Sequence, residues 1–481
     1  MSTLTSPVQQ SKHPASRRSA LVIAVMIVAA LMDMLDVTVV NVALPTLRVK
    51  LHASPTELEW LIAGYLLAFG ATLIVWGRIG DLVGRRRVFL GAVAIFGAAS
   101  LGAGLSPTIA SLIAFRLIQG AAAGALVPQV LATFRSSLDH STRVVAFGIY
   151  GAVAGLAAAA GVVLGGVLTQ YDVLGLGWRT IFFVNVPVAL AVLLCARLIP
   201  ESRPGGRGSL DPAPMVLVPL ALTAIVYPLL EGQANGWPVW GFCILSAGVI
   251  GLGAAVFLER SRSVDREPLL NVQQFRIRAF SAGLGVQLLF SGAMQGMSLA
   301  FVLWLQVGHH YTPLHTGLTL LAFSGGAILT APQSGKLAES RGAGVLMAGA
   351  ALLVIGTAML AIPAWQHSAN VPGWAAFGGL AIAGAGLGLL VVPLVNVVLA
   401  AVPVDTAGGA SGTFSTAQQL GGALGIAVIG SVFFGHTPGA HLNAAFGAAQ
   451  VGVLAAYAGA GVLCLLLPRS ALSEERTMQV Q

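Results

Sequence analysis

The segment GRIGDLVGRRR, at Gly77–Arg87, joins two long apolar runs and indicates the fold of the whole chain. Its first and eighth residues are glycines, which permit close backbone approach or a positive φ, so the spacing predicts a tight turn between two helices. The segment GKLAESRGAG, at Gly335–Gly344, aligns with it without a gap. The matched pairs are Gly77 with Gly335, Arg78 with Lys336, Asp81 with Glu339, and Gly84 with Gly342, and a weaker echo pairs Gly120, Gly124 and Pro128 with Gly384, Gly388 and Pro393. These matches predict two related halves.

The composition indicates a membrane protein. Hydrophobic residues make up 56% and charged residues only 9% of the 481 residues, whereas a soluble domain has about 25% charged residues. The apolar runs are about 20 residues long, which is enough to cross the hydrocarbon core as helix, and they lack the alternation that a membrane barrel needs. They lie near 20–42, 58–77, 88–106, 109–133, 144–169, 180–199, 214–231, 240–258, 279–305, 314–335, 344–363, 374–400, 411–435 and 446–467. We therefore expect an all-α polytopic membrane protein with 14 transmembrane helices.

The basic residues predict the orientation of the chain. Of the 25 Lys and Arg residues, all but Arg48, Lys50, Arg116 and Arg179 lie in alternate gaps between the apolar runs. Because basic loops stay on the cytoplasmic face during insertion, both termini should be cytoplasmic in a multi-pass protein of the cytoplasmic (inner) membrane. The net charge of +8 then faces anionic lipid, so the bilayer, and not nucleic acid, is the expected partner.

Two charged stretches divide the chain into three parts. We expect an N-terminal six-helix bundle at 1–199, linkers with two inserted helices at 200–278, and a C-terminal six-helix bundle with a short cytoplasmic tail at 279–481. Parallel six-helix repeats are typical of secondary transporters that bind substrate between their halves. The sequence offers no role for the inserted pair.

Two acidic residues lie inside the first apolar run. Asp36 is part of LDVTVVNVALP at Leu35–Pro45, and Asp33 precedes it by one turn on the same helical face. An acid in hydrocarbon costs several kcal/mol unless it is protonated, paired or lines water, so both are candidate proton carriers. Two carboxyl groups this close would titrate as a pair.

Arg116 is the basic residue that lies well inside an apolar run, in the segment Ile113–Pro128. A buried guanidinium needs a counterion, and Asp33 or Asp36 is the natural candidate. Such a pair either takes part in proton coupling or is a fixed structural ion pair, and the sequence leaves both alternatives open. We expect proton coupling to involve Asp36, Asp33 and Arg116.

These motifs resemble those of the major facilitator superfamily, and specifically its branch of fourteen-span drug:proton antiporters. Gly77–Arg87 resembles the superfamily's signature loop, although Leu82 stands where that loop usually has a basic residue. Leu35–Pro45 matches the branch motif LDxTxxNxALP, and the spacing of Arg116, Gln119 and Gly120 resembles the fourth-helix motif. The three arginines that end this loop can reach phosphates or a neighbouring carboxylate such as Asp139. The resemblance implies that Gly77, Asp81, Gly84, Arg85 and Arg86 latch the outward-facing state.

Two later segments support the same resemblance. The fifth run resembles the antiporter signature, with helix-packing glycines in place but Val162 instead of the usual proline; these glycines are Gly155, Gly161, Gly165 and Gly166. EWLIAGYLLAFG, at Glu59–Gly70, has the Trp–Tyr–Leu pattern of the second span. WRTIFFVNVP, at Trp178–Pro187, matches WRxxFxxNxP, which implies that Arg179 and Asn185 order the outer end of the sixth span.

The resemblance implies proton-coupled efflux of small amphipathic or drug-like molecules by alternating access, and no enzyme activity. The alternatives are a dedicated exporter of one metabolite or antibiotic, an uncoupled facilitator or importer, and a membrane sensor that does not transport. No nucleotide-binding motif is present, so we expect a proton gradient as the energy source, no cofactor and no metal. The expected partners are a small-molecule substrate and protons, with periplasmic adaptor proteins left open.

Overall fold

The computed structural model describes residues 17–171, 175–202, 212–260, 272–366, 368, 370–403, 406–436 and 442–467. Both chain ends and most of the two predicted linkers, 203–211 and 261–271, lie outside the described residues. Within the described part, 14 helices are long and apolar enough to cross a membrane. The predicted number of spans and the all-α fold class are therefore confirmed.

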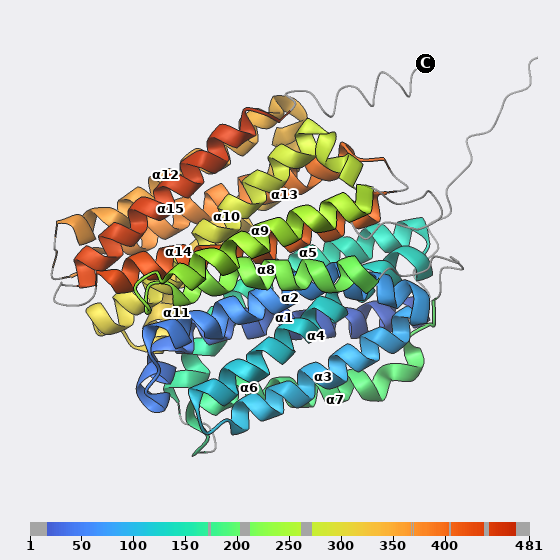
Figure 1. Ribbon diagram of the computed structural model, residues 1–481, viewed down its shortest axis with the longest axis horizontal. Coiled ribbons are helices and arrows are strands. Elements are labelled where there is room, and N and C mark those ends of the chain that lie inside the picture. Colours follow the sequence, from blue (N-terminus) through green and yellow to red (C-terminus); the bar gives the residue numbers. More distant parts are fainter. Residues whose placement is uncertain are drawn as a thin grey trace, which may run out of the picture.

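The helices follow one another along the chain as antiparallel spans (Figure 1). Those of the first half are α1 (Arg17–Leu51), α2 (Pro55–Val83), α3 (Arg85–Leu105), α4 (Ile109–Ser137), α5 (His140–Gln170), α6 (Thr180–Phe183) and α7 (Asn185–Leu194). The inserted helices are α8 (Pro212–Glu231) and α9 (Val239–Arg260). Those of the second half are α10 (Arg278–Leu303), α11 (Pro313–Arg341), α12 (Ala343–Trp365), α13 (Leu380–Ala400), α14 (Ala407–Gly435) and α15 (Leu442–Cys464).

The sixth span is interrupted. It runs over Gly177–Leu198 and contains α6 and α7, with a turn at Val184 between them. Pro187 is the third residue of α7 and has no backbone N–H, so it cannot bond the carbonyl four residues earlier. The break sets the start of α7 at Asn185.

Each half packs mainly with itself, and the halves meet along two helix pairs. In Figure 1, α1–α7 (blue to green) and α10–α15 (yellow to red) occupy opposite sides, with the green α8 and α9 lying across the junction. Helix α2 packs on α14, and α5 packs on α11. Helix α8 contacts both α2 and α14, so the inserted pair covers one of the two seams.

The helix junctions in the two matched segments share a glycine with positive φ and a hydrogen bond back to the preceding helix. Gly84 separates α2 from α3 with a φ of 116°, and Gly342 separates α11 from α12 with a φ of 55°. The N–H of Gly84 donates to the carbonyl of Gly80 at 3.0 Å, and that of Gly342 donates to Ala338 at 2.8 Å. A positive φ is strained for any residue with a side chain, so the glycines fix both turns, as the sequence predicted.

The weaker echo also corresponds to equivalent packing. A Cβ on Gly120 of α4 would overlap the carbonyl oxygen of Tyr65 on α2, and a Cβ on Gly384 of α13 would overlap that of Phe323 on α11. Because neither glycine has a side chain, each helix pair approaches backbone to backbone. The two halves are therefore related in their helix contacts as well as in their turns.

The next turn repeats this equivalence. A Cβ on Gly124 would overlap the hydroxyl of Thr72, and a Cβ on Gly388 would overlap that of Thr330. Each threonine hydroxyl also lies near a carbonyl of the facing helix, at 3.4 Å in the first half and 2.9 Å in the second.

We call the end of the bundle that carries the α1–α2 turn the outer end, following the prediction from charge. There the halves touch through α5 and α11: the backbone N–H of Leu314 donates to the side-chain oxygen of Gln170 at 3.2 Å. A second contact between the halves joins α1 to the segment that follows α10, where Gln306 donates to the carbonyl of Val42 at 2.9 Å. By contrast, a Cβ on Gly151, in the inner half of α5, would meet nothing within 4 Å. The outer ends of the halves are thus held together in this conformation.

Candidate functional site

The two acids of α1 are buried in the first half. Asp36 is 2% exposed and forms an ion pair with Arg116 of α4. The side-chain amide of Asn185, the first residue of α7, donates to Asp36 Oδ1 at 2.8 Å. Gln119 of α4 donates to the same oxygen at 3.3 Å. Asp36 therefore joins three helices, and donors contact both of its oxygens.

Arg116 is the centre of a wider network. Its Nη1 also donates to the side-chain oxygen of Gln119 at 3.3 Å, and its Nε donates to the carbonyl of Leu61 at 3.4 Å. The guanidinium lies 4.1 Å from the ring centroid of Tyr65, a cation–π distance. Gln119 in turn donates to the hydroxyl of Ser100 on α3 at 2.8 Å. The guanidinium is thus compensated by charge, hydrogen bonds and an aromatic face.

Asp33 has a different environment. It is 5% exposed, and its carboxyl accepts a hydrogen bond from the hydroxyl of Tyr65. This is its one hydrogen bond to the described residues, and it forms no ion pair with any of them. Asp36 and Arg116 lie within electrostatic range of it. Of the two acids, Asp33 is the one with free acceptor capacity.

The structure chooses between the counterions that the sequence left open. Arg116 pairs with Asp36, and Gln119 lies in the same network. The interpretation of Asn185 as an outer-end residue was wrong, because the start of α7 lies beside Asp36. Arg179 does lie where expected: it donates to the carbonyl of Ser106 at 3.4 Å, at the outer end of α3.

Two members of the network were missed as site residues. Tyr65 lies inside the Trp–Tyr–Leu pattern of the second span, and Ser100 lies in the third apolar run. A phenol in an apolar run needs a hydrogen-bond partner when it is buried, and this signal could have linked Tyr65 to an acid. Ser100 has no comparable signal, since serine is common in packed membrane helices.

The predicted latch residues lie at the inner end of α2 and α3. Arg85 forms an ion pair with Asp81 at 2.9 Å and donates to the carbonyl of Ala132 on α4 at 3.2 Å. The backbone N–H of Arg86 is 3.4 Å from a carboxylate oxygen of Glu201. Gly77 approaches Pro128 of α4. The loop is thus tied to α4 and to the segment after the sixth span.

An arginine of this loop does reach a neighbouring carboxylate, but it is Glu201, 3.9 Å from Nε of Arg87, and not Asp139. Its carboxylate begins α5 instead, accepting from the hydroxyl of Ser141 at 2.5 Å and from the N–H of Thr142 at 3.1 Å. These hydrogen bonds hold the pKa of Asp139 well below its usual range. A carboxylate at a helix N-terminus is a stable arrangement by itself, so it competes with the loop arginines.

The predicted packing glycines of α5 have two environments. A Cβ on Gly161 would overlap the hydroxyl of Thr38, and one on Gly165 would lie 2.8 Å from the carbonyl oxygen of Val39. A Cβ on Gly155 would meet nothing within 4 Å. The outer glycines therefore press α5 against the part of α1 that carries Asp36.

Gly166 faces the other half. A Cβ there would lie 2.8 Å from the carbonyl oxygen of Pro313 and 2.7 Å from Cα of Leu314. We expect Gly166→Ala to destabilise this outer-closed conformation by about 1–3 kcal/mol, since neither backbone atom can move away without shifting α11. Thermal unfolding of purified protein in detergent measures the effect.

The matched control is Gly155→Ala, on the same helix. It adds the same methyl group in open space and should be neutral or stabilise by up to about 1 kcal/mol through helix propensity. Equal shifts in Tm for the two variants would contradict the close contact between α5 and α11.

Two related six-helix halves with a buried acidic network define a class of membrane transporters built from parallel repeats. Residues 26–426 match the family model of the Major Facilitator Superfamily, and the chain belongs to that superfamily. It is 35% identical to the "Probable actinorhodin transporter" of Streptomyces coelicolor, over 88% of this chain and 73% of that one. It is 34% identical to the tetracenomycin C resistance and export protein of Streptomyces glaucescens, over 84% and 74%.

A third relative is the puromycin resistance protein pur8 of Streptomyces alboniger, which is 35% identical over 86% of this chain and 82% of that one. Solved structures have the same fold. The POT family transporter PepTSo aligns with a TM-score of 0.68 at 14% identity, over 97% of this chain and 99% of that one. A D-xylose–proton symporter aligns with a TM-score of 0.64 at 14% identity, over 94% and 98%. The protein is thus a multi-pass transporter related to antibiotic and multidrug exporters.

Proposed function

We propose that the protein exports small amphipathic molecules across the cytoplasmic membrane in exchange for protons, with both termini cytoplasmic. The observation that carries the proposal is the buried network of Asp33, Asp36 and Arg116. Ionisable groups inside a membrane protein are costly and mark ion or substrate pathways. The relatives named for antibiotic export and resistance support the direction of transport.

The contacts suggest how a proton would act on the outer seam. Protonation of Asp36 removes the charge that binds Arg116, Gln119 and Asn185, so it weakens the hold of α4 and α7 on α1. Two residues further along α1, Thr38 begins the surface on which α5 packs through Gly161. Movement of α1 is therefore transmitted to α5, whose outer end meets α11.

In this proposal, Asp33 is the site at which protons bind and are released. Its carboxyl has the Tyr65 hydroxyl as a partner and is not paired with Arg116, so a proton can bind it without breaking an ion pair. Protonation of Asp33 then changes the electrostatic field at Asp36, because the two carboxyl groups lie within electrostatic range of each other. Asp36 converts that change into helix movement.

A vesicle experiment tests the proposal. Protein reconstituted into liposomes should transport puromycin or a fluorescent lipophilic dye against its concentration gradient when a pH gradient is imposed, and a protonophore should collapse this transport. Rates that are the same with and without the pH gradient would indicate an uncoupled facilitator. Binding without any flux would indicate a sensor.

A narrower function has its own support. The actinorhodin and tetracenomycin relatives are each named for a single compound, so a dedicated exporter of one antibiotic or metabolite is the second candidate. A resistance panel in an efflux-deficient bacterial host separates the two. Protection against one chemical family favours the dedicated exporter, and protection against unrelated amphipathic compounds favours a multidrug exporter.

A further inference from the structure

A carboxyl lies in the outer part of the α2–α14 seam, away from the central network and from the inner loop. Glu59, one turn into α2, is 3% exposed. Its side chain occupies the space left by Gly430 of α14, where a Cβ would overlap a carboxyl oxygen of Glu59. The first half thus places an acid directly against the backbone of the second half.

The two helices remain in contact further inwards. A Cβ on Gly422 of α14 would lie 3.0 Å from Cδ1 of Leu66 on α2. The hydroxyl of Thr416 donates to the carbonyl of Gly70 at 3.3 Å. Among these contacts, Glu59 has the outermost position and the one ionisable side chain. Because the halves meet along α2–α14 and α5–α11, an opening to the outer side has to separate α2 from α14 and bring water to Glu59.

No basic group in the described part of the chain compensates this acid. Glu59 forms no ion pair there, and the facing helix α14 has no ionisable side chain between Ala407 and Gly435. Arg116 of α4 belongs to the central network, and the other arginines of α3 and α4 lie at the inner end. Arg48 and Lys50, in the last turn of α1, do not pair with it either.

The charged group that does lie near Glu59 is another acid. Glu231, at the end of α8, is within electrostatic range of it. The carboxylate of Glu231 accepts from the indole N–H of Trp60 at 2.8 Å, so it is held beside the same turn of α2. On α2 itself, Glu57 accepts from the backbone N–H of Ser54 at 2.7 Å in the exposed capping turn. The charge of Glu231 disfavours a second negative charge on Glu59.

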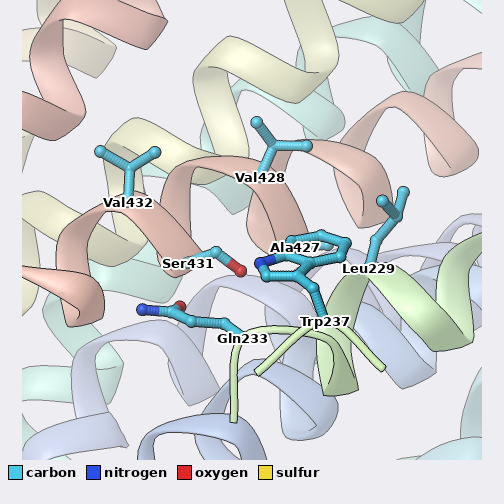
Figure 2. A pocket seen from close by; sticks show the side chains of 7 residues that line it. All are labelled: Leu229, Gln233, Trp237, Ala427, Val428, Ser431 and Val432. Atoms are coloured by element: carbon cyan, nitrogen blue, oxygen red, sulfur yellow. The ribbon is translucent and has the colours of Figure 1, made fainter. Parts of the chain in front are cut away.

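The pocket at the outer end of α14 offers no counterion. It has a volume of about 330 Å³ and lies between α14 and the α8–α9 turn (Figure 2). Leu229, Gln233 and Trp237 line one side, and α14 residues between Ala427 and Val432 line the other. None of these lining side chains is ionisable. A carboxylate packed against this part of α14 would therefore be uncompensated from the pocket as well.

These surroundings determine the protonation of Glu59. An isolated carboxylate in a low-dielectric interior is so costly that the group takes up a proton instead. A glutamic acid in water is ionised at neutral pH. Closure of the outer seam therefore binds one proton at Glu59, and opening of the seam releases it.

We propose that Glu59 is a proton-binding site of the outer seam, and that a proton taken from the outer side stabilises the outer-closed conformation. The proton joins a carboxylate oxygen when α2 and α14 close, and it returns to the same side when they part. It is thus distinct from the protons that the proposed exchange carries across the membrane. The site goes beyond the proposed function, because it links the outer pH to the conformation whether or not Asp33 and Asp36 couple transport.

Proton linkage sets the sign and the size of the effect. The closed conformation binds one more proton than the open one, so acid favours closure and alkali favours opening. For one proton, the ratio of open to closed molecules rises by up to about ten-fold per pH unit once an exposed glutamic acid is ionised, above about pH 4.3.

Spin labels at the outer ends of the two halves test the proposal. In the full-length protein, Cys195→Ala, Cys243→Ala and Cys464→Ala remove the native thiols. Tyr171→Cys and His436→Cys then introduce exposed labelling sites at the ends of α5 and α14. Double electron–electron resonance in lipid nanodiscs gives the ratio of open to closed molecules from about pH 5.5 to about pH 8.5, a range in which an exposed carboxyl is ionised.

The decisive comparison is between this labelled parent and Glu59→Gln, which cannot ionise. We expect the open-to-closed ratio of the parent, divided by that of Glu59→Gln, to rise by up to about ten-fold per pH unit. The division removes the response of all groups that the two proteins share. Glu59→Met, which is neutral and of similar length, should give the same result, so either variant suffices if the other does not fold. Glu57→Gln is the matched control and should behave as the parent at every pH.

Asp36→Asn with Arg116→Gln separates this site from the central network. In that background, the divided ratio should still rise with pH, although gradient-driven export is lost. Export that proves independent of a pH gradient would contradict the proposed function and leave this result unaffected. A divided ratio that is constant with pH, or that falls as the pH rises, would overturn the role of Glu59. Loss of the rise in the Asp36→Asn and Arg116→Gln background would assign the response to the central network and overturn it as well.

Discussion

Asp36→Asn should reduce proton-gradient-driven export to background, a loss of about 100-fold for a coupling free energy near 3 kcal/mol. The substitution keeps the shape of the side chain but removes the charge that pairs with Arg116. It also leaves a buried guanidinium uncompensated, which costs about 3–5 kcal/mol of folding stability. Transport in vesicles and thermal unfolding should therefore both change.

The double variant Asp36→Asn with Arg116→Gln separates coupling from folding. Removing both charges relieves the uncompensated guanidinium, so the thermal stability should return towards that of the parent protein. Export should stay at background, because the variant lacks the Asp36 carboxyl, which in the proposed mechanism converts protonation into helix movement. If the double variant regained gradient-driven export, the Asp36–Arg116 pair would be a fixed structural ion pair and the proposed mechanism would fail.

Asp33→Asn should uncouple transport without unfolding the protein. The new amide oxygen can still accept from the Tyr65 hydroxyl, and no ion pair is broken, since Arg116 pairs with Asp36. We expect substrate to equilibrate across vesicles at a rate near that of the parent protein. The acceleration by an imposed pH gradient should fall by about ten-fold or more, because the exchange site can no longer release a proton. Measurement of dye flux with and without the pH gradient gives both the equilibration rate and its acceleration by the gradient.

Tyr65→Phe is the matched control for this variant. It removes the one hydrogen-bond donor to Asp33 but leaves the acid and the aromatic face over Arg116. Acceleration by the pH gradient should therefore persist. Full acceleration in Asp33→Asn, combined with its loss in Asp36→Asn, would show that Asp36 alone carries the proton.

Part of the site could be predicted because membrane burial limits what a charge can do. Arg116 stands inside an apolar run, so a counterion on another helix had to exist. The choice between Asp33 and Asp36 depends on how α1 is rotated against α4, and the sequence of an almost wholly apolar helix does not mark that rotation. The misplacement of Asn185 has a similar cause, since the depth at which the broken sixth span re-enters the bundle is set by packing on α1.

The position of the inserted helices is even harder to predict from the sequence. Glu231 reads as an ordinary acid at the end of a span, and Glu59 as a polar residue near the start of another. They become neighbours because α8 packs across α2 and α14, and nothing in the local sequence of α8 specifies that seam. Gly430, which makes room for Glu59, is one of 60 glycines and carries no separate signal.

The sequence by itself determined the membrane class, the fourteen spans and the glycine turns at Gly84 and Gly342. These features follow from transfer free energy and backbone conformation, which act over about 20 residues or fewer. Only the tertiary structure decided which acid pairs with Arg116, that Asn185 joins it, that α5 and α11 close the outer seam, and that Glu59 and Glu231 lie near each other. These depend on helix rotation and contact between distant segments, where packing shape and not local polarity decides the outcome.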